Sequence, residues 1–208
     1  WAAAAQRTRG FLLGGTAGRT TLNGEGLQHE DGHSHLMSAT IPNCISYDPT
    51  YGYELAVIVQ DGLRRMYAEQ EDVFYYITVM NENYDQPPMP DGAAENILKG
   101  MHLFQSGISR KKVPKVNLLG SGTIFCEVVE AAALLRDDWG VEADLWSCTS
   151  FTELARDGVA CERWNRLHPT AKARVSHVEK YLTKTEIPAI AATDYIRAFA
   201  EQIRPFIN

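Results

Sequence analysis

Cysteine, positive charge and long hydrophobic runs are all scarce in this chain, and each scarcity excludes a class of protein. Only 4 of the 208 residues are cysteine. They are widely spaced and form no C-x-x-C pair, so neither a disulfide framework nor a zinc knuckle is indicated. Lys and Arg number 20 against 26 Asp and Glu, which gives a formal net charge of -6. This balance argues against a general nucleic-acid binder, which needs a surplus of cations.

No apolar run approaches the roughly 20 residues that a membrane-spanning helix requires. The first residues also lack the charged start, apolar stretch and small-residue cleavage site of an export signal. We therefore expect a soluble, cytoplasmic protein with neither a membrane nor a nucleic acid among its partners. The chain begins at Trp1 without an initiator methionine and runs directly into a helix-like alanine stretch. We expect it to start inside an element of a longer protein.

Hydrophobic patterns predict alternating strands and helices over most of the chain. Cys44–Tyr47 has the length and apolar character of a short strand, and Val73–Met80 has those of a strand covered on both faces. Between them, apolar residues recur every three or four positions from Leu55 to Tyr67, which is the pattern of an amphipathic helix. A strand–helix–strand unit of this kind implies a parallel sheet.

The pattern changes from Tyr84 onward, where prolines, a short helical stretch at 93–99 and a basic segment interrupt the alternation. We expect a linker at 91–115. Beyond it, strands are predicted at 116–119, 143–148 and 187–192, and helices at 124–135, 161–167 and 194–204. The predicted fold class is therefore α/β, with two consecutive layer domains on parallel or mixed sheets at residues 1–90 and 116–208.

Titratable side chains are concentrated in a glycine-rich segment near the start of the chain. From Gly10 to Gly32 we predict no regular structure, and so long a stretch inside a compact domain is typically functional. Glycines let the backbone approach a ligand, and imidazoles transfer protons or stabilise developing negative charge near neutral pH. The segment is a candidate site because such groups rarely gather without a ligand. Its titratable members are Glu25, His29, Glu30, Asp31, His33 and His35.

Three interpretations of this cluster remain open from the residues alone. His29, His33 and His35 have the short spacings found in metal-dependent hydrolases, although no fourth ligand is evident and the glycines do not fix the ligands in place. A second interpretation is proton transfer around an organic cofactor. The third is a non-catalytic α/β module whose role is subunit association.

Two further patterns predict local structure. Gly120-Ser121-Gly122 stands between a predicted strand and a predicted helix, where it could cradle a phosphate, but the full dinucleotide-binding pattern is absent and a tight turn is preferred. Ser150, followed three residues later by Glu153, predicts a capped helix start.

Four ordered segments, spread over most of the chain, resemble one known family. They are similar to the homodimeric type of pyruvate dehydrogenase component, a member of the transketolase-like superfamily. The segments are 19–35, Ile41–Asp48, Asn81–Tyr84 and Thr149–Gly158. By this resemblance, residues 1–90 are the later part of a pyrimidine-binding domain and residues 116–208 are a truncated carboxy-terminal domain. The chain then resembles an internal or carboxy-proximal fragment of the family.

The resemblance implies an enzyme that uses thiamine diphosphate and Mg2+ to decarboxylate pyruvate. Its partners are implied to be a second copy of itself and the lipoyl domain of a dihydrolipoyl acetyltransferase, which receives the acetyl group. The implied catalytic residues are His29 and Glu25, on a mobile loop. Transketolase similarity implies that Asp31 and His35 lie near the substrate and the cofactor, and Glu30 and His33 are their neighbours in the same segment.

The chain also departs from the family pattern. The Gly-Asp-Gly segment and the paired asparagines that hold diphosphate and metal in the superfamily are absent, so we expect no metal ligand here. The glutamate that activates the cofactor is expected upstream of Trp1. If the active site is built between domains and subunits, this chain would contain only one side of it. We therefore expect the chain alone to be inactive.

Overall fold

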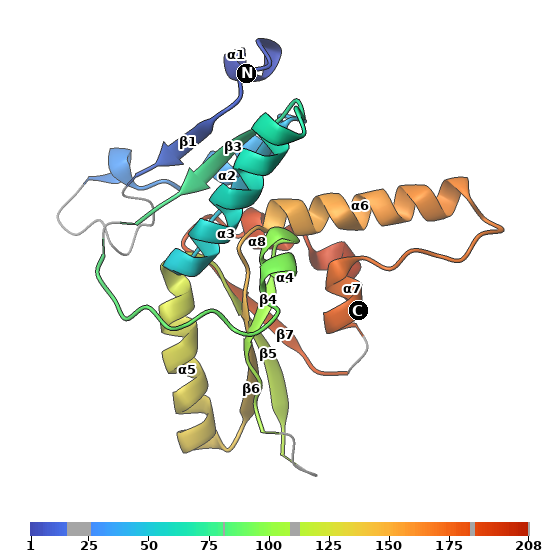
Figure 1. Ribbon diagram of the computed structural model, residues 1–208. Helices are drawn as coiled ribbons and strands as arrows, with labels where there is room; N and C mark the ends of the chain where they lie inside the picture. Colours follow the sequence, from blue (N-terminus) through green and yellow to red (C-terminus); the bar gives the residue numbers. More distant parts are fainter. Residues whose placement is uncertain (16–25, 81, 109–112, 184–185, 208) are drawn as a thin grey trace.

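The chain folds into two α/β layers, seen in the computed structural model in Figure 1, which describes residues 1–15, 26–80, 82–108, 113–183 and 186–207. Within these ranges the first sheet has three parallel strands in the order β1-β3-β2. Its strands are β1 (Phe11–Gly14), β2 (Cys44–Tyr47) and β3 (Phe74–Thr78). Its helices are α1 (Ala2–Ala5), α2 (Ser34–Ala39), α3 (Gly52–Leu63), continued by a π turn at Arg64–Ala68, and α4 (Ala94–Leu98).

The second sheet, again within the described ranges, has four strands in the order β4-β6-β5-β7, and β4 is antiparallel to β6 while the other pairs are parallel. Its strands are β4 (His102–Gln105), β5 (Lys115–Gly120), β6 (Glu142–Ser147) and β7 (Ala189–Ala192). The helices are α5 (Ile124–Trp139), α6 (Phe151–Leu167), α7 (His177–Leu182) and α8 (Ala198–Glu201), followed by a 3-10 turn at Arg204–Phe206. In Figure 1, α5 runs beside this sheet, and α6 extends outward from the junction of the two layers.

Local sequence explains where the long helices begin and end. The hydroxyl oxygen of Ser150 accepts a hydrogen bond from the amide of Glu153 at 3.0 Å, so α6 has the capped start that its sequence predicts. Helix α5 ends at Gly140, whose φ of 63° lies in the left-handed region that glycine tolerates. None of the described helices is long and apolar enough to cross a membrane.

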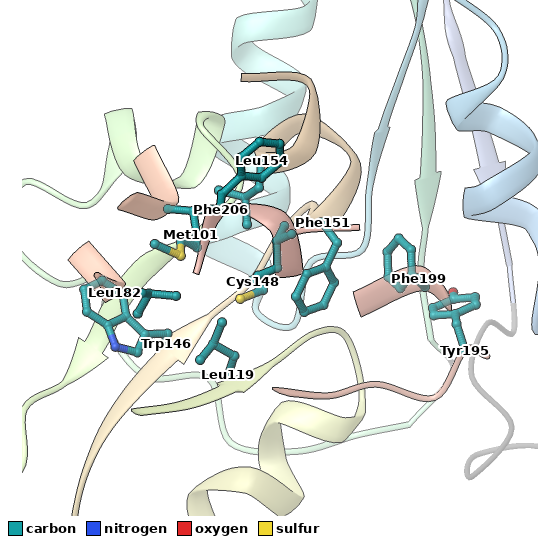
Figure 2. Packing of buried hydrophobic residues seen from close by; sticks show 12 residues of the cluster. Met101, Leu119, Trp146, Cys148, Phe151, Leu154, Leu182, Tyr195, Phe199 and Phe206 are labelled. Carbon is teal, nitrogen blue, oxygen red and sulfur yellow. The ribbon is translucent and has the colours of Figure 1, made fainter. Parts of the chain in front are cut away.

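The largest apolar cluster lies between the second sheet and helices α6 to α8 (Figure 2). Leu119 of β5 and Trp146 of β6 face Phe151 of α6 and Phe199 of α8, and each of these side chains is buried. A fully buried side chain of this size stabilises the fold by about 1.5–3 kcal/mol. Because the cluster draws on elements more than 50 residues apart, it fixes how the helices lie on the sheet.

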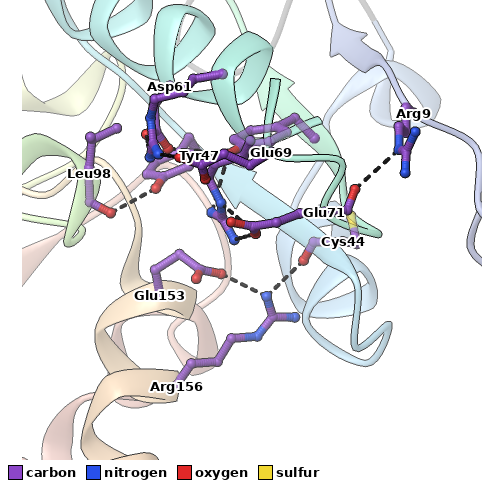
Figure 3. Close-up of polar contacts among 12 residues, drawn as sticks. Arg9, Cys44, Tyr47, Asp61, Glu69, Glu71, Leu98, Glu153 and Arg156 are labelled. Atoms are coloured by element: carbon purple, nitrogen blue, oxygen red, sulfur yellow. Dashed lines mark hydrogen bonds and ion pairs between the residues drawn. The ribbon is translucent and has the colours of Figure 1, made fainter. Parts of the chain in front are cut away.

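Partly buried polar contacts connect helix α6 with the first layer (Figure 3). Arg156 of α6 donates hydrogen bonds to the carbonyls of Cys44, at 2.8 Å, and Ile41, at 3.1 Å, and it pairs with Glu153 at 2.7 Å. Burial raises the pKa of Glu153, and the adjacent Arg156 guanidinium opposes that rise. The Tyr47 hydroxyl donates to the carbonyl of Leu98 at 2.7 Å. The contacts of Arg156 hold the start of α6 against the end of α2 and strand β2, and the Tyr47 hydrogen bond holds α4 against β2.

The predicted α/β fold is confirmed, and so are several of its elements. The strand at Cys44–Tyr47 has the predicted bounds, and its parallel pairing with β3 is confirmed. The prediction that residues 10–32 lack regular structure is wrong at β1 and at the 3-10 turn Leu27–His29. Strand β4, inside the expected linker, and helix α7 were not predicted. Strands β1 and β4 have four residues each and are partly exposed, whereas the equally short strand β2 is buried along its whole length.

Candidate functional site

A buried polar cluster lies where the carboxy ends of the parallel strands of both sheets meet. Open α/β sheets bind ligands at this edge. We call these residues the junction cluster: His35 of α2, Asp48 after β2, Thr78 at the end of β3, Ser121 after β5 and Thr193 after β7.

Asp48 is the centre of the junction cluster. Thr78 Oγ1 donates to Asp48 Oδ1 at 2.6 Å, and Ser121 Oγ donates to Asp48 Oδ2 at 2.8 Å. The Asp48 amide donates to the carbonyl of Thr149 at 2.7 Å. Burial raises the pKa of Asp48 to about 6, and the two donated hydrogen bonds limit the rise. The carboxyl is therefore mainly ionised at neutral pH and is held by both layers.

The Gly120-Ser121-Gly122 segment forms a tight turn, and the Asp48 carboxylate packs against it. Gly122 has a φ of +52°, and a Cβ there would lie 2.6 Å from Asp48 Oδ2. The amide of Gly122 donates to the Asp48 carbonyl at 3.1 Å. A carboxylate of the same chain thus occupies the space beside this turn, which supports the structural interpretation over a phosphate cradle.

His35 is almost fully buried, and its ring is enclosed by aromatic side chains. Nε2 lies 2.9 Å from Thr78 Oγ1. The ring stacks on Phe199 with centroids 4.9 Å apart and meets Tyr195 edge-on at 4.9 Å. Burial lowers the pKa of His35 to about 4, although the charge of Asp31 opposes the shift, so the imidazole is neutral near pH 7. Its Nδ1 is buried and has no hydrogen-bond partner among the residues that the structure describes.

Asp31 organises the start of α2. Its Oδ1 accepts hydrogen bonds from the amides of His33, at 2.9 Å, and Ser34, at 3.0 Å, and the Ser34 hydroxyl donates to Oδ2. Burial disfavours the charged carboxylate, but these hydrogen bonds outweigh it, so the pKa of Asp31 lies below its ordinary value. This is the position where a negative charge stabilises a helix amino terminus.

The remaining predicted site residues lie in different surroundings. His29, at the end of the turn Leu27–His29, and His33 are both exposed, and Glu30 is partly buried. Glu25 lies outside the described residues. Asp31 is therefore hydrogen-bonded to the start of α2 and His35 lies beside Thr78 in the junction cluster, whereas His29 and His33 lie on the surface. The structure does not test the catalytic role of any of them, and these roles stay predictions.

The three histidines of the hydrolase interpretation do not converge on one point. His35 turns inward to Thr78, whereas His29 and His33 are exposed. Among the described residues, no group of three or more His, Cys, Asp or Glu side chains is arranged to hold a metal ion.

Sequence reasoning missed a second buried cluster, centred on Glu54 of α3. Glu54 Oε1 lies 2.7 Å from His102 Nε2 and accepts from Ser147 Oγ at 2.5 Å, while Oε2 accepts from the amides of Thr50 and Tyr51 at 2.6 and 3.0 Å. Both Glu54 and His102 are buried. A glutamate near the start of an otherwise apolar helix was the available signal, but its partners are 48 and 93 residues away.

The order and pairing of the helices and strands define a transketolase-like α/β fold. A transketolase variant from Pichia stipitis superposes with a TM-score of 0.56 at 15% identity, covering 94% of this chain and 28% of that one. A transketolase from Leishmania mexicana gives 0.53 at 13% identity, covering 82% and 21%. At such identities the likeness shows the fold alone.

Sequence comparison is more specific. Residues 1–87 match the family described as pyruvate dehydrogenase E1 component middle domain, and residues 100–206 match the family described as transketolase-like TK C-terminal domain. The chain is 69% identical over 207 residues to a pyruvate dehydrogenase E1 component of Cupriavidus necator, 62% identical to one of Pseudomonas aeruginosa and 59% identical to one of Escherichia coli.

These matches cover 100% of this chain but 23% of each relative, so the chain spans about a quarter of their length. The chain belongs to the transketolase-like family, whose carboxy-terminal domain model matches residues 100–206, and it is similar along its whole length to pyruvate dehydrogenase E1 components. The comparisons give no support to a metal hydrolase or to a non-catalytic association module.

Proposed function

We propose that this chain contributes part of the catalytic region of a thiamine diphosphate-dependent pyruvate dehydrogenase. The complete enzyme would decarboxylate pyruvate and transfer the acetyl group to the lipoyl domain of a dihydrolipoyl acetyltransferase, acting as a cytoplasmic homodimer. The observation that carries this proposal is the 69% identity to the Cupriavidus necator protein, which extends over the whole chain. We assign residues 1–90 to the pyrimidine-binding domain, 91–115 to a linker and 116–208 to the carboxy-terminal domain.

Among the described residues, groups suited to the thiamine part of such a cofactor are present, but none suited to its diphosphate and Mg2+ is evident. When bound, thiamine diphosphate supplies the carbon chemistry, and the protein supplies orientation and proton transfer. A neutral, buried imidazole with an unpartnered Nδ1, as in His35, suits a hydrogen-bond donor on a small organic molecule. The described residues offer no cluster for Mg2+. Because the family's diphosphate and metal motifs are absent from the sequence, we assign the metal and the diphosphate to parts of the complete enzyme outside this chain.

Within this site, we assign proton transfer to His29 and Glu25. The side chain of His29 is exposed in the described structure, so other parts of the complete enzyme would have to cover it to form a closed site. Asp31 is assigned to the surroundings of substrate and cofactor, and it also holds the segment in place through the start of α2. Glu30, His33 and His35 are assigned to the surroundings of substrate and cofactor.

Replacing His29 by alanine in the complete enzyme tests the assignment. We expect overall complex activity to fall by at least about tenfold, because a positioned general acid or base contributes that much or more. Cofactor affinity, measured by titration calorimetry, should stay unchanged. His168→Ala is the matched control, since His168 is also an exposed histidine but stacks on Trp164 at the end of α6. Unchanged turnover in His29→Ala would contradict the assignment.

Titration with thiamine diphosphate distinguishes the proposed enzyme from the alternative of a non-catalytic subunit-association module. The complete enzyme should bind thiamine diphosphate saturably in the presence of Mg2+ and should turn over pyruvate. A complete, folded protein that binds no thiamine diphosphate would leave subunit association as its role.

A further inference from the structure

A continuous row of buried hydrogen bonds connects His35 to both layers of the fold. His35 Nε2 lies 2.9 Å from Thr78 Oγ1, and Thr78 Oγ1 lies 2.6 Å from Asp48 Oδ1. All three side chains are buried, with exposed fractions of 1% for His35 and Thr78 and 5% for Asp48. Because bulk water does not reach these groups, each proton in the row has a small number of possible positions.

The chemistry of the three side chains determines which atom donates and which accepts in each hydrogen bond of the row. An ionised carboxylate only accepts hydrogen bonds, and Asp48, with a pKa raised by burial to about 6, is mainly ionised at neutral pH. Thr78 has one hydroxyl proton, and the Asp48 oxygen at 2.6 Å is a closer acceptor for it than the Tyr47 carbonyl at 3.3 Å. Thr78 Oγ1 must then accept from His35, which places the single proton of the neutral imidazole on Nε2.

With the proton on Nε2, His35 Nδ1 is unprotonated and can only accept a hydrogen bond. Nδ1 is the ring atom without a hydrogen-bond partner among the described residues. Phe199 on one face and Tyr195 at the edge restrict rotation of the ring. A buried, oriented and unpaired acceptor costs free energy unless a donor from outside these residues reaches it. The arrangement therefore points to a bound molecule that donates a hydrogen bond at this place.

We propose that Asp48 and Thr78 are positioning residues, which hold the proton of His35 on Nε2 so that Nδ1 accepts a hydrogen bond from a hydroxyl or amino group of the bound substrate or cofactor. This inference rests on the proposed function, because it requires a small molecule beside His35. Asp48 is suited to the role since Ser121 and the backbone of Thr149 anchor it from the second layer.

Kinetics of three variants of the complete enzyme test the proposal. Thr78→Val removes the hydroxyl and keeps the shape, so kcat for pyruvate should fall by at least about tenfold while KM changes by less than about threefold. Thr78→Ser restores the hydroxyl and should restore kcat to within about twofold of the unmodified enzyme. Thr152→Val is the matched control, because it makes the same exchange at another buried threonine, which lies in α6 outside the junction cluster. Its kcat should change by less than about threefold.

Neutron diffraction of the unmodified complete enzyme reads the proton position without requiring activity. We expect deuterium on His35 Nε2, directed at Thr78, and none on Nδ1. Deuterium on Nδ1 would overturn the inference, and so would equal losses of kcat in Thr78→Val and Thr152→Val. If Thr78→Val does not fold, the deuterium position and the Thr78→Ser kinetics decide. An unmodified enzyme without pyruvate turnover would refute the proposed function, and the deuterium position would still test the proton assignment separately.

Discussion

The two halves of the histidine-rich segment have the same kinds of residue and opposite surroundings. In residues 26–33 the side chains of His29 and His33 are exposed, whereas two positions further on His35 is buried between Phe199 and Tyr195. Burial removes the charge of His35 and directs its one proton to Thr78. The side chains of His29 and His33 lie at the surface instead. Environment, and not residue type, therefore determines which proton chemistry each histidine can perform.

The largest expected contrast between the two halves is in stability. His35→Ala should lower the free energy of unfolding by about 3 kcal/mol, because it leaves a cavity beside Phe199 and removes the donor to Thr78. His33→Ala, at an exposed position in the same segment, should change it by less than about 0.5 kcal/mol. Urea unfolding followed by tryptophan fluorescence measures both. Equal losses in the two variants would remove the contrast.

A second contrast is in the pH dependence of stability. The pKa of His35 falls from 6.5 to about 4 on folding, so the unfolded chain binds the proton first and stability is lost as pH falls from about 6.5 to 4. Between pH 7 and pH 5 this contribution is about 2 kcal/mol. Asp48 acts in the opposite sense, because its raised pKa favours the folded state as pH falls through 6.

The two opposing contributions are separated by a variant. His35→Gln keeps a side chain able to hydrogen-bond but cannot take up the proton that His35 binds in the unfolded chain. Between pH 7 and pH 5, the free energy of unfolding should therefore fall less in this variant than in the unmodified protein, by about 2 kcal/mol. Asp31 also faces His35 and shifts its pKa, and it is retained in both proteins. Identical pH profiles from urea titrations would show that His35 does not titrate as described.

The smallest of the expected effects concerns the boundary between the halves. Asp31→Ala removes the acceptor of the His33 and Ser34 amides and should cost about 1 kcal/mol. Glu30→Ala, next to it and without these contacts, should cost less than about 0.5 kcal/mol. Urea unfolding midpoints compare the two. Equal stability of both variants would mean that Asp31 does not start α2.

The fold was predictable wherever a pattern repeats locally. Cys44–Tyr47 is a short apolar run, and Ser150 with Glu153 is a helix start that depends on neighbours three residues apart. Strand β1, by contrast, is recognisable only from its pairing with β3, about 64 positions along the chain. Strand β2 is just as short and also lies at an edge, but it is buried along its whole length, so its apolar run was recognisable.

The candidate site was predictable only in part for the same reason. The sequence indicated the segment that contains His35 but not that Asp48, Thr78 and Ser121 would surround it, since these residues are brought together by two separate sheets. Nor did it separate the buried histidine from the exposed ones, because burial depends on α8, which lies far along the chain. What the sequence lacked was the relative placement of the two layers.

Hydrogen exchange of the complete enzyme, with and without thiamine diphosphate, Mg2+ and pyruvate, tests the central claim most directly. The peptide covering residues 26–33 should exchange at least about tenfold more slowly when the small molecules are bound, whereas the peptide covering 34–48 should be slow in both states. Equal exchange of residues 26–33 in the two states would contradict the account, because the exposed histidines would then face no site at all.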